Sequence, residues 1–591
     1  FQNRTGSEVP PYQDHRYGLS AGGPVYIPKV YNGKNKTFFF YLWEANKIQY
    51  AYDFTNTVPT AEMKRGDLSP LLKLGSSYQV YDPATTTANA NGTYSRQPFT
   101  GNIIPTSRLD PVAQNLLKYW PEPNSPLTTT NEFKNNHFVS YAGPFPVWTH
   151  LARVDHTFNP NHRMYVRIMR EGFYSESNRR FLNDYDGMHY NQDKWGFALD
   201  DVYMFSPSFF MNVRYGLADR WSDQYRFTQG FDLSKLGFSQ TFLNQIPDPK
   251  LSSLPYVAVS PFQTLAGNGL YADSSSFINT FTANFTKLKG VHSIRFGGEV
   301  RQTREFSMSP TWDNTPRFTF ASTYTNGPLN TSTAPKMGGE IASFLLGLPG
   351  TSSYMSKSAD FATQEIYYGL YIHDDVKLTP KLTMNIGVRW EYETPLTERF
   401  NRSITQFDFG AASPIEAAVK AAYAANPIPE VAASDFRVKG GLLFAGVNGN
   451  SRALWNAEKN NFMPRIGFAY QVQPTLVFRA GYGIFFDSIG INTNNVTQSG
   501  FGKSTPVQVS MDSGLTYIAS TANPFPNGIM QPAGTQGGLS TNLGQGASFF
   551  QKNRKNPYNQ RWSFGFQKLF PGQFMVDASY VGSRATRLLI S

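Results

Sequence analysis

The segment that most constrains the fold runs from Lys381 to Tyr392 and reads KLTMNIGVRWEY. Large apolar residues such as Leu382 and Ile386 alternate strictly with polar or charged residues such as Asn385 and Arg389. In an extended chain, this period of two places the two sets on opposite faces. One face suits lipid and the other suits an aqueous lumen, so the pattern predicts a strand of a transmembrane β-barrel.

The composition of the 591-residue chain leaves room for membrane strands but not for membrane helices. Mean hydropathy is -0.39, and no run of eighteen or more apolar residues occurs. Aromatic residues make up 15% of the chain, which suits the aromatic girdles of a barrel. No cysteine is present, and this excludes disulfides, thiolate metal sites and cysteine nucleophiles.

The basic character of the chain does not predict a nucleic-acid partner. The formal net charge is +11, but the Lys and Arg residues are spread over predicted strands and loops rather than clustered on one face. At the start of the chain, Phe1-Gln2-Asn3 shows neither a basic segment nor an apolar one, so no signal peptide is visible.

Pairs of alternating segments are joined by short turns along the whole chain. Turn chemistry lies at their tips, as in Asn159-Pro160-Asn161-His162 and Ser206-Pro207-Ser208. The pattern predicts roughly seven hairpins and fourteen antiparallel strands. The hairpins are 17–27 with 37–48, 151–158 with 164–169, 202–205 with 209–217, 277–300, 367–392, 466–486 and 562–581.

The segments between hairpins are long, polar and rich in Pro, Gly, Asn and Thr. Short turns therefore alternate with long loops, as in outer-membrane barrels with short periplasmic turns and long extracellular loops. Loops of this length commonly carry function, so we expect them to form the recognition surface. The predicted loops are 51–146, 172–193, 223–274, 303–362, 394–461 and 488–557.

Three short helices are predicted within these loops. Ser413-Pro414-Ile415-Glu416 is a capping-box signature before the helical segment 417–425. Asp110-Pro111-Val112 opens a second helix that reaches Tyr119. The apolar run 341–348 predicts a third, which we expect to pack among the loops as a hydrophobic plug.

Charged residues recur on the polar face of the predicted strands. An arginine that faces hydrocarbon costs roughly 2–4 kcal/mol at the membrane midplane, so these side chains are assigned to the lumen. There they either steer an anionic solute or, as we favour, pair across neighbouring strands or contact a plug. The lumen-facing candidates are Arg214, Arg295, Glu299, Arg301, Arg389, Glu391, Arg479 and Asp487.

Two groups of ligand-type side chains do not predict a metal site. In His373-Asp374-Asp375, the middle residue of the strand points away from the other two. Asp184, Asp186, His189 and Asp193 share a predicted loop, where calcium is a remote alternative because the spacing differs from an EF-hand. No catalytic motif or phosphate-binding loop is found, so no enzyme, cofactor or metal is predicted.

Short motifs recur from near the first residue to near the last. They are GGPV at 22–25, KNKTFFF at 34–40, VPTAEMKRGD at 58–67, YDPATT at 81–86, GNIIP at 101–105, RLDPVA at 108–113, RVDH at 153–156, IHDD at 372–375, PRIGFAY at 464–470 and YVGS at 580–583. Together they resemble the barrel of Oar-like TonB-dependent receptors.

The resemblance implies an outer-membrane transporter with a 22-stranded barrel and an N-terminal plug. It further implies a TonB box, pulled by an inner-membrane energising complex, and often a carboxypeptidase-regulatory-like domain ahead of the plug. None of these upstream parts is matched, and the predicted strands number about fourteen rather than 22. We therefore expect residues 1–591 to be a β-barrel domain that is incomplete at both ends.

The function implied is energy-coupled uptake of a large solute, a peptide, protein or glycan, captured by extracellular loops. The expected partners are outer-membrane lipid, the TonB energising complex acting through the missing plug region, and an unknown extracellular ligand. Two alternatives stay open. One is a passive porin without plug or TonB box, and the other is a surface adhesin or structural barrel that moves nothing.

Overall fold

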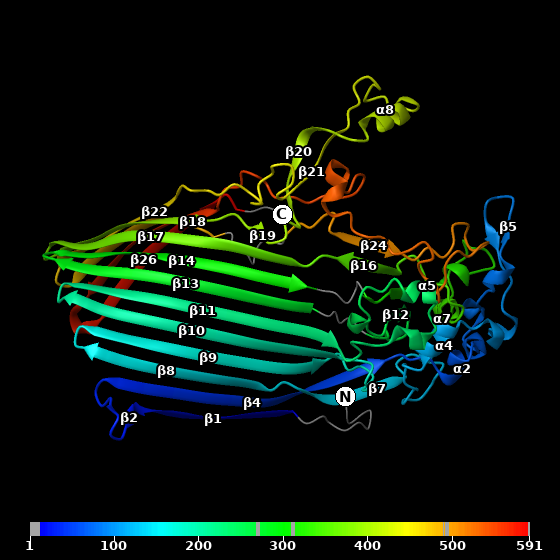
Figure 1. Ribbon diagram of the computed structural model, residues 1–591, viewed down its shortest axis with the longest axis horizontal. Coiled ribbons are helices and arrows are strands. Elements are labelled where there is room, and N and C mark those ends of the chain that lie inside the picture. The colour runs from blue at the N-terminus through cyan, green and yellow to red at the C-terminus, as the bar shows by residue number, and fades with distance from the viewer. Residues whose placement is uncertain (1–11, 267–271, 309–313, 489, 491–495, 589–591) are drawn as a thin grey trace.

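One large antiparallel sheet dominates the structure (Figure 1). The computed structural model describes residues 12–266, 272–308, 314–488, 490 and 496–588. Consecutive strands of the sheet pair in chain order, and the sheet curls so that β26 passes behind the front strands. The long strands are β1 (Gln13–Pro24), β4 (Thr37–Asn56), β8 (Val147–Asn159), β9 (His162–Ser177), β10 (Met188–Ser206), β11 (Phe209–Arg226), β13 (Ala272–Lys289), β14 (His292–Met308), β17 (Phe361–Thr379), β18 (Leu382–Glu393), β22 (Asn461–Gln473), β23 (Leu476–Phe486), β25 (Tyr558–Leu569) and β26 (Met575–Thr586).

The seven predicted hairpins are confirmed, from β1–β4 to β25–β26. Two short strands, β7 (His137–Pro144) and β19 (Thr397–Glu398), add to β4 and β17 and bring the sheet to sixteen strands. Within the described residues β1 and β26 are the two edges, so the barrel is not closed.

The predicted loop 172–193 is wrong. β9 runs on to Ser177 and β10 begins at Met188, so only residues 178–187 connect them. Likewise β4 continues to Asn56, where β7 returns beside it. In β9 the backbone ladder continues from 170 to 177, but there both faces carry polar residues, so the period of two that marks a half-buried strand is lost although the hydrogen bonds are kept. In β4 the alternation itself continues through Tyr50, Tyr52 and Phe54.

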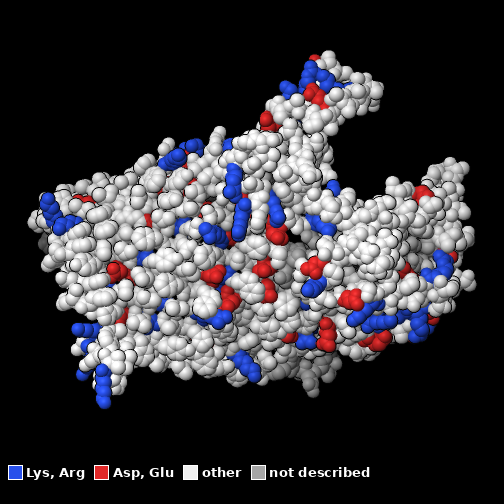
Figure 2. Space-filling model, viewed as in Figure 1, with Lys and Arg blue, Asp and Glu red and all other residues white. Residues whose placement is uncertain are grey.

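The two faces of the sheet differ as the alternation predicts. Ile386 and Leu370 are 46% and 57% exposed on one face, among many other exposed large apolar side chains. Arg389 and Glu391 belong to the other. Figure 2 shows a broad face of the molecule on which large uncharged areas separate scattered charged side chains, several of them near the middle of the view. No helix in the described ranges is long and apolar enough to cross a membrane.

The loops fold together at the end of the sheet opposite the short turns (Figure 1). A hydrophobic core of 40 buried residues draws on five of the connections between hairpins, from Val58 in the first to Phe525 in the last. A four-stranded sheet, β12-β15-β16-β24, joins three of these connections. We call this body the loop cap. Its strands are β12 (Tyr256–Val259), β15 (Arg317–Phe320), β16 (Tyr354–Ser358) and β24 (Gly502–Pro506).

Two of the predicted helices are confirmed, but they end at Leu117 and Leu345 rather than at Tyr119 and Leu348. Helix α4 (Pro111–Leu117) is capped by Asp110, whose Oδ1 accepts the Ala113 N–H at 2.9 Å. Helix α7 (Gly339–Leu345) has six of its seven residues buried in the cap, including Phe344. The other short elements are α2 (Ala61–Lys64), α3 (Ser69–Leu72), α5 (Gln240–Leu243), β2 (Tyr26–Ile27), β3 (Tyr31–Asn32), β5 (Thr87–Ala88) and β6 (Tyr94–Ser95), with 3₁₀ turns at Ser76–Tyr78, Pro83–Thr85, Thr100–Asn102, Thr106–Arg108, Leu233–Leu236, Pro249–Leu251, Ser322–Tyr324, Gly534–Ser540 and Pro571–Gln573.

The third helix forms without its predicted capping box. Helix α8 (Glu416–Ala424) follows Ile415 as N-cap, and no side chain caps it. The Glu416 N–H instead donates to the Ser413 carbonyl at 3.1 Å, so Ser413 to Glu416 is a turn before the helix. Helix α8 belongs to an arm with β20 (Ile404–Ala412) and β21 (Lys439–Phe444), which projects away from the sheet (Figure 1).

Candidate functional site

A network of charges spans β14, β17 and β18 on the polar face of the sheet. The Arg389 Nε lies 2.6 Å from the Glu391 Oε1, and the Arg389 Nη2 lies 3.9 Å from the Glu299 Oε2. The Arg389 Nη2 also donates to the Tyr367 hydroxyl at 2.7 Å. Glu299 in turn lies 3.6 Å from Arg301. The register pairs Glu299 with Gly369 and Gly369 with Glu391, so these residues share one face.

Further pairs lie on the same face, nearer the turns. The Arg295 Nη2 lies 2.8 Å from the Asp375 Oδ2, and the His373 Nε2 lies 2.8 Å from the Asp375 Oδ1. On β10 and β11, the Arg214 Nη2 lies 2.6 Å from the Asp200 Oδ2. Six of the eight charged candidates form ion pairs, but Arg301 and Glu391 pair only within their own strands. Pairs between different strands, the arrangement that we favoured from the sequence, involve Arg214, Arg295, Glu299 and Arg389.

Arg479 and Asp487 are not part of these clusters. Across the residues that the structure describes, neither forms an ion pair. Arg479 lies opposite Ala469 and Gly565, while Asp487 follows β23 and donates its backbone N–H to the Pro557 carbonyl at 2.8 Å.

Sequence reasoning did not identify other charges on this face. The Lys194 Nζ lies 2.7 Å from the Glu171 Oε1, and the Arg153 Nη2 lies 2.6 Å from the Asp155 Oδ1. The register puts Lys194 opposite Glu171 on β9 and β10. Glu171 and Lys194 lie just outside the predicted loop 172–193 and also outside the predicted strands 164–169 and 202–205, so neither residue was assigned to a face.

The two groups considered as metal ligands do not converge. Asp374 points to the opposite face from His373 and contacts His292 there, with 2.6 Å between the carboxylate oxygen and the His292 Nδ1. Asp193 lies on a strand and pairs with Arg170 at 2.8 Å. Within the described part of the chain, no group of three His, Asp or Glu side chains is placed to hold a metal ion.

Asp186 has a structural role in the loop between β9 and β10. Its Oδ2 accepts the backbone N–H of Arg180 at 2.5 Å and that of Phe181 at 3.0 Å. The side chain is buried, and burial raises the pKa of Asp186 to about 6 against the opposing effect of these two hydrogen bonds. The carboxylate thus closes the loop and places Phe181 in the core of the cap.

Buried Arg96 ties three segments of the cap together. Its Nη1 donates to the Thr323 and Asn326 carbonyls at 2.9 and 3.1 Å, and its Nη2 donates to the Ser513 carbonyl at 2.7 Å. The Arg96 Nε donates to the Thr86 Oγ1 at 3.0 Å. Desolvation lowers the pKa of Arg96. No local sequence pattern marks this residue, because its partners are distant carbonyl groups.

A family model described as an outer membrane beta-barrel domain matches residues 1–591. The chain belongs to this family. The protein therefore lies in the bacterial outer membrane, in agreement with the apolar outer face of its sheet. No curated protein matches the sequence.

Three of the similar solved structures are a transporter, a pyoverdine-bound protein and an import receptor. The outer membrane transporter YddB of Escherichia coli gives a TM-score of 0.47 at 9% identity over 97% of this chain and 47% of its own. FpvA of Pseudomonas aeruginosa, bound to heterologous pyoverdines, gives a TM-score of 0.40 at 9% identity over 97% of this chain and 47% of its own. The ferric-catecholate import receptor Fiu of E. coli K12 gives a TM-score of 0.38 at 9% identity over 98% of this chain and 59% of its own. The chain thus spans about half the length of these proteins.

Proposed function

We propose that the protein is the barrel domain of a TonB-dependent outer-membrane receptor that captures a large solute and imports it with energy from the inner membrane. The observation that carries this proposal is the loop cap. Five loops that leave the sheet separately share one hydrophobic core instead of extending into solvent as independent segments. The motifs that resemble Oar-like TonB-dependent receptors support the same class, and several of them, such as Val58 to Asp67, lie within the cap.

The cap suits the capture of a large ligand because it is preorganised. A loop that is already folded does not lose conformational entropy when a ligand binds, so more of the contact energy appears as affinity. Arg96 and Asp186 hold loop backbones through hydrogen bonds, and helix α7 fills the centre. The projecting arm adds exposed apolar side chains, Phe409 and Ile428 among them, that a peptide, protein or glycan can contact.

In this proposal the paired charges on the polar face line the lumen. Arg389, Glu299 and Glu391 hold neighbouring strands together, while Arg479 and Asp487 are free of ion pairs in the described structure and are the candidates for contact with a plug or a passing solute. The plug and TonB box belong to this proposal through the motif resemblance.

An uptake experiment tests the function. Cells that express the full-length protein, with or without the TonB energising complex, are incubated with fluorescent peptides, proteins and oligosaccharides of graded size. We expect surface binding in both strains and accumulation inside the cell only in the energised one. Equal accumulation in both strains identifies a passive porin, and binding without accumulation in either identifies an adhesin.

A further inference from the structure

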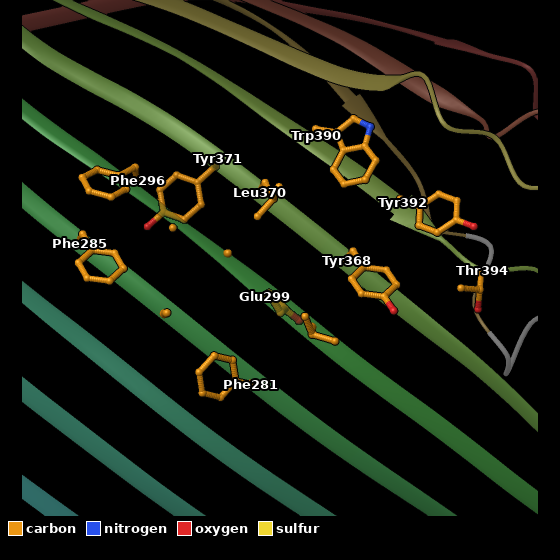
Figure 3. A pocket seen from close by; sticks show the side chains of 14 residues that line it. Phe281, Phe285, Phe296, Glu299, Tyr368, Leu370, Tyr371, Trp390, Tyr392 and Thr394 are labelled. Carbon is orange, nitrogen blue, oxygen red and sulfur yellow. The ribbon is translucent and has the colours of Figure 1, made fainter.

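An apolar groove crosses the outer face of the sheet between β13 and β18 (Figure 3). It encloses about 880 Å³, and its floor is open because Ala283 and Gly298 carry little or no side chain. Phe281 and Phe285 flank it on one side, and Tyr368, Trp390 and Tyr392 on the other. The ion pairs of Glu299 lie on the opposite face of β14, so the exposed walls of the groove are aromatic and aliphatic.

A second pocket, of about 840 Å³, lies farther from the turns on the same strands. Arg304, Arg399 and Arg452 line it, all three exposed, and within the described residues none has a carboxylate partner. The Arg452 Nη2 donates to the backbone carbonyls of Glu398 and Arg399, both at 3.1 Å, which fixes its guanidinium. Glu305 also lines the pocket, but it follows Arg304 on β14 and so points to the other face, where Arg220 is its charged neighbour.

A ladder of amides connects the two pockets. Asn279 donates to Gln302 at 3.5 Å, Gln302 donates to Gln364 at 3.3 Å, and the Arg304 Nε donates to the Gln364 Oε1 at 2.9 Å. From Val300 in the groove to Arg304 the strand advances four residues, or roughly 13 Å. The outer face therefore changes from apolar to neutral polar and then to cationic within that distance.

We propose that this face binds a membrane lipid with a phosphorylated headgroup. The acyl chains fill the groove over Gly298, the amide ladder meets the hydroxyl or amide groups at the base of the headgroup, and the three arginines bind phosphate. Guanidinium groups match phosphate oxygens through paired, charge-assisted hydrogen bonds. The order apolar, amide, arginine is that of such a lipid standing in the membrane, and a neutral lipid or an apolar peptide would leave the three cations without a partner.

Two variants separate headgroup binding from chain binding. The double variant Arg304→Gln with Arg399→Gln removes two cations and retains Arg452, whose hydrogen bonds hold a loop. Ala283→Phe fills the groove and leaves the charge unchanged. The charge-matched control is Arg437→Gln with Lys439→Gln, at two exposed positions of the distant arm. Heat-dependent gel mobility checks that each variant is folded.

The assay is native mass spectrometry of the full-length protein in neutral detergent, titrated with a diphosphorylated glucosamine lipid, with its dephosphorylated form and with inorganic phosphate. We expect the phosphorylated lipid to bind the native protein and the control pair alike, and the double arginine variant at least about tenfold more weakly. Ala283→Phe should also weaken binding. The proposal is overturned if the dephosphorylated lipid binds as tightly, if the arginine variant is unaffected, or if inorganic phosphate competes fully for the site and Ala283→Phe has no effect.

Discussion

The outer face of β18 offers a graded test of which surface meets lipid. The sequence alone suggests arginine at Ile386 as the probe, but the register places Asp374 directly opposite Ile386 on the same face. An arginine there can pair with that carboxylate and recover part of its cost. Val388 lies two residues farther along, between Ile372 and Pro464, and is 39% exposed with no charge opposite.

Val388→Arg should therefore destabilise the folded protein in a bilayer by about 2–4 kcal/mol, the cost of arginine near the midplane. Ile386→Arg should cost less, because an ion pair with Asp374 offsets part of the desolvation. Asn385→Arg should cost least, since position 385 lies on the polar face beside Asp375.

Urea titrations of the full-length protein refolded into lipid vesicles, followed by heat-dependent gel mobility, measure these free energies. Equal free energies of unfolding for Val388→Arg and Asn385→Arg would refute the assignment of the two faces. A cost for Ile386→Arg as large as that for Val388→Arg would show that Asp374 does not reach it.

Two further predictions concern the loop cap. Phe344→Ala should destabilise the cap by about 3–5 kcal/mol, because Phe344 is fully buried against Trp120 and Phe320. Amide hydrogen exchange should become faster across the cap, while the amides of the β13–β14 ladder stay protected. Equal loss of protection in both regions would mean that the cap and the sheet unfold together. Asp186 predicts a pH dependence. The pKa of Asp186 is about 6 in the folded state and near 3.8 in the unfolded state. Its contribution to the free energy of unfolding, about 3 kcal/mol, is therefore fully present below about pH 4 and is lost as the pH rises through 6. Asp186→Asn should flatten the exchange protection of the Arg180 and Phe181 amides between pH 4 and 7, and an unchanged pH profile in that variant would disprove the role of the carboxylate.

The membrane strands were predictable because lipid imposes a strict period on them. Asn159-Pro160-Asn161-His162 marked a turn between two alternating segments, and the structure has the β8–β9 hairpin there. The same rule placed Arg295, Arg389 and Glu391 on one face. The rule failed where the strands extend beyond the membrane. Asn191 and Gln192 are adjacent in β10 and both pair with residues of β9, so both faces of the strand are polar there.

The loop cap was not predictable, because its core is assembled from residues that are distant in sequence. Trp120, Phe344 and Phe525 share one core, yet no periodic pattern links them. Helix α7 could be expected from its apolar run, whereas the neighbours that bury it could not. The arginines at 304, 399 and 452 come from three separate segments, so only the fold shows that they line one pocket.

Site-directed labelling in intact cells tests most directly whether the cap is outside the cell and the turns are inside. Residues 1–591 contain no cysteine, so each introduced thiol is unique within this region. Ser434 is exposed on the projecting arm, and Asn161 is exposed in the turn between β8 and β9. With a membrane-impermeant maleimide, Ser434→Cys should react in intact cells, and Asn161→Cys only after the outer membrane is permeabilised. The reverse pattern, or equal reaction of both in intact cells, would contradict a barrel that presents its loop cap to the exterior.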